Sequence, residues 1–163
     1  MSNEIHDMAI KLGEALMSHH WQLSTAESCT GGLVAGAVTE IAGSSAWFDR
    51  GFVTYSNEAK VEMLGVSPLT LHAHGAVSEA TVREMLAGAL AKSVAHVAVA
   101  ISGIAGPGGG TPEKPVGTVC FGWQRRGYPA ECITRHFSGD RTAVREAAVR
   151  LSLEGLLGLA ATA

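Results

Sequence analysis

The chain has 163 residues, a length that suits one domain with a well-developed hydrophobic core. Hydrophobic residues make up 47% and charged residues 17%, which excludes intrinsic disorder and favours a well-buried sheet. The formal net charge is −3 and no basic tract occurs, so we do not expect nucleic acid as a partner.

The cysteines and the N-terminal residues indicate the compartment. Cys29, Cys120 and Cys132 are scattered and form neither a disulfide framework nor a C-x-x-C zinc motif, which is typical of reduced thiols in the cytoplasm. Residues 1–11 lack the apolar core of a signal peptide, and no apolar run is long enough to cross a membrane. The histidines show no H-x-x-x-H spacing, so we expect no metal ion. We therefore expect a cytoplasmic protein without a membrane segment.

The first part of the chain alternates helices and strands. Apolar residues at helical spacing predict a helix over residues 4–19. A short apolar run predicts a strand over 22–26, and a helix rich in small residues is predicted over 30–41. Aromatic and β-branched residues predict a second strand over 48–55.

The middle of the chain is predicted to contain two helices with an irregular segment between them. A short helix is expected over 57–64, where Gly65 ends it. Residues 66–76 contain Pro68 and Gly75 and are expected to be irregular. A longer helix follows over 79–92, after a serine that suits the N-cap position.

The last part of the chain contains three predicted strands. The continuous apolar run over 94–101 is typical of a strand that is covered on both faces. A glycine-rich loop follows, and further strands are predicted over 116–124 and 130–137, joined by a tight turn. A final helix is predicted over 141–157.

This order of elements predicts an α/β fold. We expect a three-layer α/β/α sandwich with a mixed, mostly parallel central sheet of about five strands. Strands that are linked through helices should be parallel, whereas the tight turn over 125–129 makes at least one pair antiparallel. No linker or internal repeat interrupts the pattern, so residues 1–163 are expected to form one domain.

Ser28 lies at the turn from the first predicted strand into the next helix. A serine at this position can cap the helix by accepting a backbone N–H bond. It can also act as a nucleophile, with free N–H groups and the positive end of the helix beside it. Cys29 is a rival nucleophile, because a nearby helix N-terminus lowers the pKa of a thiol.

Tyr55 and Lys60 follow the second predicted strand. Because the carboxyl ends of parallel strands share one edge of a sheet, both residues can converge with Ser28 in one crevice. A lysine with a lowered pKa can be the base that a serine nucleophile needs, and a tyrosine can relay the proton. The alternative is a solvated surface lysine and an aromatic residue whose hydroxyl faces water.

The loop from Ser102 to Thr111 is rich in glycine, and its N–H groups can form an anion site. It is neither a G-x-G-x-x-G fingerprint nor a Walker A loop. Arg141 and Arg145 begin the last predicted helix, where cations oppose the helix dipole and a bound anion would explain them. They can equally be surface charges that pair with neighbouring carboxylates.

Several motifs agree with one family in the same order along nearly the whole chain. They are Thr25–Gly32, Tyr55–Lys60, Ser102–Pro107, Gly109–Thr111, Lys114–Val119, Phe137, Gly139, Arg141 and Val144–Arg145. Together they resemble the CinA carboxy-terminal domain family, which includes stand-alone nicotinamide-nucleotide amidases. The resemblance implies hydrolysis of nicotinamide mononucleotide to nicotinate mononucleotide and ammonia, without a metal or an organic cofactor.

The resemblance also implies roles for particular residues. Ser28 would be the nucleophile, and neutral Lys60 would take its proton directly or through Tyr55 while backbone N–H groups hold the oxyanion. We expect a pyridine mononucleotide as small-molecule partner and a homo-oligomer, a dimer or larger. Substrate binding is expected of Thr30, Gly31, Ser102, Gly103, Gly106, Gly109, Gly110, Thr111 and Arg141.

Two other classes of function stay open at this point. The chain could be a non-catalytic nucleotide-binding or regulatory module, in which Ser28 only caps a helix and the glycine-rich loop holds a phosphate. It could also be a scaffold that acts through oligomer contacts. Release of ammonia by the purified protein separates the enzyme from both.

Overall fold

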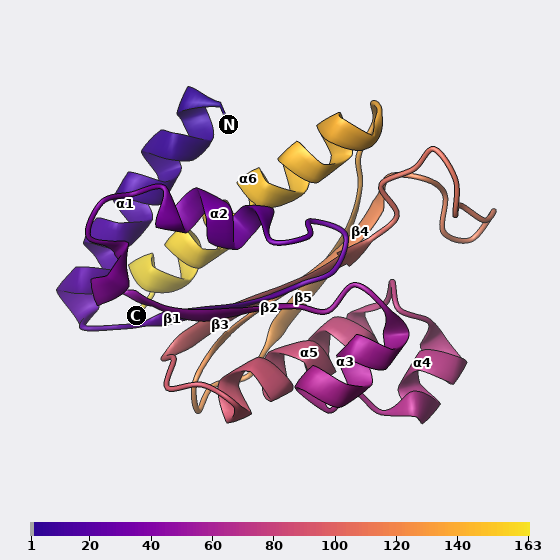
Figure 1. Cartoon of the computed structure of the whole chain (residues 1–163), viewed down its shortest axis with the longest axis horizontal. Helices are drawn as coiled ribbons and strands as arrows, with labels where there is room; N and C mark the ends of the chain where they lie inside the picture. Colours follow the sequence, from indigo (N-terminus) through magenta and orange to yellow (C-terminus); the bar gives the residue numbers. More distant parts are fainter. Residues whose placement is uncertain (1) are drawn as a thin grey trace.

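The computed structural model describes residues 2–163, so Met1 of the expected domain lies outside the described residues. The expected three-layer α/β/α sandwich is confirmed, with a five-stranded sheet between two groups of helices. Helices α1 (Asn3–His19), α2 (Leu33–Thr39) and α6 (Arg141–Ala161) cover one face (Figure 1). Helices α3 (Asn57–Leu64), α4 (Pro68–His74) and α5 (Glu79–Ala91) cover the other.

The sheet has the strand order β2-β1-β3-β4-β5. Strand β1 pairs in parallel with β2 and β3, whereas β4 is antiparallel to both β3 and β5. The directions of β1, β2, β3 and β5 therefore agree and β4 is reversed, as expected of a mixed, mostly parallel sheet. The strands are β1 (Leu23–Glu27), β2 (Phe48–Val53), β3 (Val97–Gly103), β4 (Thr118–Arg125) and β5 (Glu131–His136).

The core is divided into two layers by the sheet. Along β3, Val99 and Ile101 pack into the cluster shared with α1, α2 and α6, while Ala98 and Ala100 pack into the cluster around α5. This alternation follows from the period of two in a strand, and it places Ser102 on the α5 side. The parallel pairs bring the carboxyl ends of β1, β2 and β3 to one edge, and that edge carries the candidate site.

The expectation of an irregular segment over 66–76 is wrong, because α4 lies within it. Ser67 caps α4 by accepting a hydrogen bond from the Leu69 N–H, and Pro68 is its first residue. Gly75 ends α4 as the C-cap. The proline and glycine are the start and stop signals of a short helix, not interruptions.

The second helix begins later than predicted, at Leu33 instead of residue 30. Gly31 and Gly32 have φ values of +56° and +101°, in the left-handed region that a right-handed helix cannot use. A short 3₁₀ helix, η1 (Ser44–Ala46), follows α2, and the other elements lie where predicted with shifted ends. Among the helices of residues 2–163, none is both long enough and apolar enough to cross a membrane.

Candidate active site

A cavity of about 270 Å³ lies where β1, β2 and β3 end. Its walls are the turn after β1, the start of α3, the segment after α4 and the loop after β3. The first residue of α6 closes it from the side. The predicted site residues that line it are Ser28, Tyr55, Lys60, Ser102, Gly103, Gly106, Gly109 and Arg141.

Ser28 and Lys60 are in direct contact in this cavity. Lys60 Nζ lies 3.0 Å from Ser28 Oγ, 2.9 Å from the Thr54 carbonyl oxygen and 3.3 Å from the Tyr55 carbonyl oxygen. Lys60 is only 1% exposed, and neither of the ion pairs found among residues 2–163 includes it. The alternative of a solvated surface lysine is therefore wrong.

The surroundings of Lys60 suit a neutral amine. Burial lowers the pKa of Lys60 below its ordinary value, because the charged ammonium loses its hydration. A neutral amine has two N–H bonds and one lone pair. The carbonyls of Thr54 and Tyr55 accept hydrogen bonds from Lys60 Nζ, and Ser28 Oγ is the third oxygen within hydrogen-bond distance of it. Once the amine is neutral, its lone pair can face the Ser28 hydroxyl. The same three contacts hold the Lys60 amine against the Ser28 hydroxyl.

Lys60 reaches the end of the strand because α3 begins directly after β2. Ser56 caps α3, with its Oγ accepting a hydrogen bond from the Ala59 N–H at 3.0 Å. Side chains of a helix lean toward its N-terminus. Lys60, which lies in the first turns, therefore points back to the backbone that connects β2 to α3.

The Glu27 carboxylate, not the Ser28 hydroxyl, accepts hydrogen bonds from the N–H groups at the start of α2, whose N-cap residue is Gly32. The Glu27 carboxylate accepts hydrogen bonds from the N–H groups of Val34 at 2.9 Å and Ala35 at 3.0 Å, and from the Thr30 hydroxyl at 2.7 Å. The capping role that the sequence left open for Ser28 is therefore wrong, and its hydroxyl stays available to Lys60. An acidic residue at the end of a buried strand, just before the glycines, is a signal that sequence reasoning missed.

Some predicted substrate-binding residues shape the surrounding loops and do not line the cavity. Thr30 is fully buried, with its hydroxyl donated to Glu27. Thr111 closes a turn, because its N–H donates to the Lys114 carbonyl and its hydroxyl accepts from the Lys114 N–H. The residues in this group are Thr30, Gly31, Gly110 and Thr111.

Cys29 also lines the cavity but is poorly suited to be the nucleophile. It is 6% exposed, and burial raises the pKa of its thiol to about 12. The reactive form of cysteine is the thiolate, which is scarce near neutral pH when the pKa is this high. The helix N-terminus that the sequence offered as an activating feature is outweighed by burial.

Arg141 joins two walls of the cavity. Its Nη1 donates to the Gly106 carbonyl at 2.9 Å and its Nη2 to the Tyr55 hydroxyl at 3.1 Å. Tyr55 is 62% exposed, and within residues 2–163 its hydroxyl is hydrogen-bonded to Arg141 alone. Tyr55 therefore contacts Lys60 through its backbone carbonyl and Arg141 through its hydroxyl, and no hydrogen bond within residues 2–163 joins the Tyr55 hydroxyl to Ser28 or Lys60.

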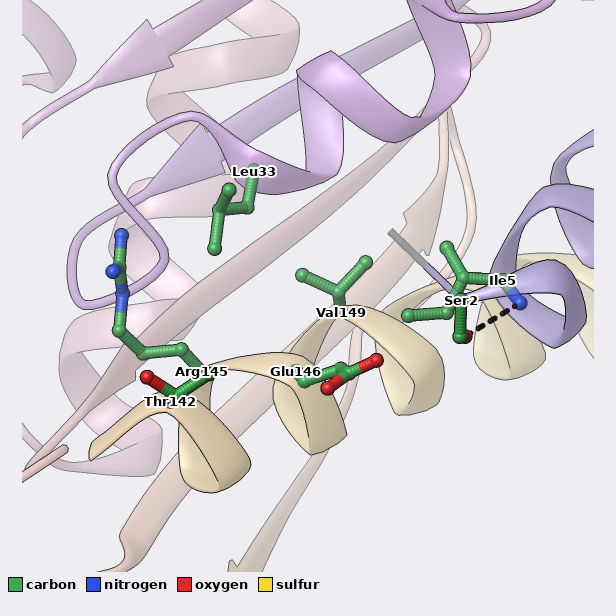
Figure 2. A pocket seen from close by; sticks show the side chains of 7 residues that line it. All are labelled: Ser2, Ile5, Leu33, Thr142, Arg145, Glu146 and Val149. Atoms are coloured by element: carbon green, nitrogen blue, oxygen red, sulfur yellow. Dashed lines mark hydrogen bonds between the residues drawn. The ribbon is translucent and has the colours of Figure 1, made fainter. Parts of the chain in front are cut away.

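Arg145 supports the turn after β1 from the opposite side of the sheet. Figure 2 shows Arg145 extending from α6 beside a second cavity of about 280 Å³ toward this turn. Its Nε donates to the Cys29 carbonyl at 3.1 Å and its Nη2 to the Thr30 carbonyl at 3.4 Å. Neither Arg141 nor Arg145 takes part in an ion pair within residues 2–163, so the expected alternative of paired surface charges is not what the structure contains.

The loop after β3 offers backbone donors to an anion. Ala105 and Gly106 line the cavity, and their N–H groups have no backbone acceptor among residues 2–163. Lys114 ties the same loop to α4, because its Nζ donates to the His74 carbonyl at 2.6 Å. Arg141 and the N–H groups of Ala105 and Gly106 together form a cluster of donors at the cavity.

Other residues at the cavity were missed by sequence reasoning. Asn57 lines it and is the first residue of α3, so its place beside Tyr55 was an available signal. Ala76 and Val77 line it from the segment after α4, a helix that was not predicted. Within residues 2–163, no group of His, Cys, Asp and Glu is arranged to hold a metal ion.

Comparison with known proteins agrees with the motifs. A model of the CinA C-terminal domain matches residues 5–160. The chain belongs to the CinA C-terminal domain family. This confirms the resemblance on which the expected site residues were based.

Relatives in the CinA family match over nearly the full length. A protein of Enterobacter agglomerans named nicotinamide-nucleotide amidohydrolase PncC is 56% identical over 153 residues, which cover 94% of this chain and 93% of that protein. The PncC protein of Escherichia coli strain K12 is also 56% identical, over 157 residues with the same coverage. The crystal structure of the competence/damage inducible protein CihA from Agrobacterium tumefaciens has a TM-score of 0.95 and 49% identity, covering 98% of this chain and 97% of that one.

Proposed function

We propose that this chain is an amidohydrolase that deamidates nicotinamide mononucleotide to nicotinate mononucleotide and ammonia, with Ser28 as the nucleophile. The observation that carries the proposal is the 3.0 Å contact between the buried amine of Lys60 and the Ser28 hydroxyl. The relatives named nicotinamide-nucleotide amidohydrolase, 50–56% identical over most of the chain, support the reaction class and the substrate.

The first half of the reaction forms an acyl-enzyme. Lys60 takes the proton of Ser28, and Ser28 Oγ attacks the carboxamide carbon of the substrate. The carbonyl oxygen becomes an oxyanion, which backbone N–H groups of the turn after β1 or of the loop after Gly103 stabilise. The protonated Lys60 then gives its proton to the leaving nitrogen, and ammonia departs.

The second half of the reaction releases the product. Neutral Lys60 takes a proton from a water molecule, which attacks the ester carbon. The ester bond to Ser28 breaks, Lys60 returns the proton to Ser28 Oγ, and nicotinate mononucleotide leaves. Lys60 thus acts as base and then as acid in both halves, using only side chains and water.

The charges of the substrate match the cavity. Arg141 and the unpaired N–H groups of Ala105 and Gly106 provide an anion site for the phosphate. The positive charge of the pyridinium ring makes the carboxamide carbon more electrophilic. It also disfavours a second positive charge nearby, which lowers the pKa of Lys60 further.

The experiment that tests the proposal measures ammonia and nicotinate mononucleotide from the purified, chelator-treated chain. The wild-type chain should release both products in equal amounts. Ser28→Ala should abolish turnover, whereas Cys29→Ala should keep most of it, with circular dichroism confirming that both variants are folded. An active Ser28→Ala variant with an inactive Cys29→Ala variant would overturn the serine assignment.

A Lys60→Arg variant tests the base separately. Arginine keeps the positive charge but stays protonated, so it cannot accept the Ser28 proton. We expect kcat to fall by about a hundredfold or more, on the usual scale for acid–base groups.

A wild-type chain that binds the mononucleotide without releasing ammonia would favour the non-catalytic binding module instead.

The remaining expectations belong to the same proposal. We propose a single amidase domain over residues 1–163 in a cytoplasmic protein, which the free thiols of Cys29, Cys120 and Cys132 support. We also propose a homo-oligomer that takes a pyridine mononucleotide and does not bind nucleic acid. Light scattering during size-exclusion chromatography measures the oligomeric state, and a monomer at working concentration contradicts this part.

A further inference from the structure

Ser102 lies beside Ser28 on the same face of the sheet. In the parallel register of β1 and β3, Glu27 faces Ile101, and the Ser28 N–H donates to the Ile101 carbonyl at 2.9 Å. Ser28 and Ser102 directly follow this last pair of the register, and both line the cavity. The residues two and four positions before Ser102 pack against α5, so its side chain emerges on that face.

The Ser102 hydroxyl is without a protein partner. Ser102 is 1% exposed and lines the cavity together with Ser28 and Lys60. Within residues 2–163, the Ser102 hydroxyl makes no hydrogen bond. Cys120, its neighbour on β4, does not serve as its partner, because the Cys120 thiol lies 3.5 Å from the Thr134 hydroxyl instead. Because Ser102 lines the cavity, a bound molecule can be the partner of its hydroxyl.

Several polar groups around this cavity donate hydrogen bonds. Arg141 and the free N–H groups of Ala105 and Gly106 are donors, and they suit the oxygens of a substrate. A carboxamide also has an NH₂ group, whose two N–H bonds need acceptors. A serine hydroxyl has two acceptor lone pairs, and Ser102 offers them next to the nucleophile.

We propose that Ser102 accepts a hydrogen bond from the carboxamide nitrogen of the bound substrate and thereby turns the carbonyl carbon toward Ser28. The inference rests on the proposed deamidation and adds the residue that recognises the amide itself. An ester oxygen of the same shape has no hydrogen to donate, so it can meet Ser102 only by accepting the Ser102 O–H.

The test compares nicotinamide mononucleotide with the methyl ester of nicotinate mononucleotide. Ser102→Ala should lower kcat/KM for the amide by about fivefold to a hundredfold, the range for leaving a buried donor unpaired. The same variant should lower kcat/KM for the ester clearly less, because the ester leaves no unpaired donor behind. Ser102→Cys is close to serine in shape but is only a weak acceptor, so it should show the same split between the two substrates.

Ser24→Ala is the matched control. Ser24 lies on β1, its hydroxyl is buried without a partner, and it does not line the cavity. This variant removes the same atom from the same sheet and should leave both substrates unaffected. A Ser102→Ala variant that is fully active on the amide overturns the inference, and so does one that loses amide and ester activity equally. A wild-type chain that cleaves neither substrate overturns the proposed function together with the inference, whereas the other outcomes leave the proposed function standing.

Discussion

A neutral Lys60 can be detected by its effect on stability before any substrate is added. Replacing Lys60 by Met keeps an unbranched side chain that is one atom shorter and removes the titrating amine. Burial lowers the pKa of Lys60 in the folded chain, while the unfolded chain keeps the ordinary value of about 10.4. Between these two values, the unfolded chain binds a proton that the folded chain does not.

The sign of the effect follows from this difference in bound protons. Stability rises with pH wherever the unfolded chain binds more protons, so the wild type gains stability from the lowered pKa of Lys60 up to about pH 10.4. The limiting slope is about 1.4 kcal/mol per pH unit. Lys60→Met lacks this contribution. The difference in unfolding free energy between wild type and variant should therefore shift toward the wild type as the pH rises.

Urea unfolding at several values from about pH 7 to about pH 10 measures this difference, with other lysines cancelling in the comparison. The lost hydrogen bonds to the Thr54 and Tyr55 carbonyls add a penalty that does not depend on pH, so only the slope is diagnostic. Lys11→Met, which removes an exposed lysine of α1, is the control. Equal slopes for the two variants would show that Lys60 is protonated in the folded chain and would refute the assignment of a neutral base.

Four substitutions test the surrounding contacts. Arg141→Ala should raise KM for nicotinamide mononucleotide about tenfold to a hundredfold, and equal losses for nicotinamide riboside, which lacks the phosphate, would place Arg141 elsewhere. Glu27→Gln should lower the free energy of unfolding by about 1.5–3 kcal/mol, because an amide cannot accept all three hydrogen bonds that the carboxylate accepts; an unchanged urea midpoint contradicts the capping role. Arg145→Ala should lower kcat with little change in KM, since the turn around Ser28 loses its support, and a pure KM effect would argue against this. Tyr55→Phe should mainly raise KM by freeing Arg141, whereas a fall in kcat of about a hundredfold would restore the proton relay.

The convergence of Ser28 and Lys60 could be predicted from the sequence. Two inferences were needed. The position of each residue after a strand follows from local pattern, and the parallel pairing of those strands follows from general rules of sheet topology. The pairing of β1 with β2 and β3 satisfies them. Sequence alone could not show that Lys60 is buried, because its burial depends on how α3 packs against the sheet.

The contacts that escaped prediction join residues far apart in the chain. Arg145 bonds to the Cys29 carbonyl across a separation of 116 residues, and Arg141 meets the Tyr55 hydroxyl across 86. No local propensity reports such a contact, since it depends on where α6 crosses the sheet. The missed helix α4 is a different kind of error, because Pro68 and Gly75 are as typical of the ends of a short helix as of a loop.

Strand alternation also explains why Lys60 and Glu27 are both buried close to Ser28 in the fold and yet do not form an ion pair. Glu27 and Ser28 are adjacent, so their side chains leave the sheet on opposite faces. The Glu27 carboxylate is taken up by the N–H groups that begin α2, while the Ser28 hydroxyl meets Lys60 on the face that carries α3 (Figure 1). A carboxylate beside Lys60 would favour the ammonium form and raise its pKa. Keeping the acid on the far face of the sheet leaves desolvation as the main influence on Lys60, and desolvation is what favours a neutral base.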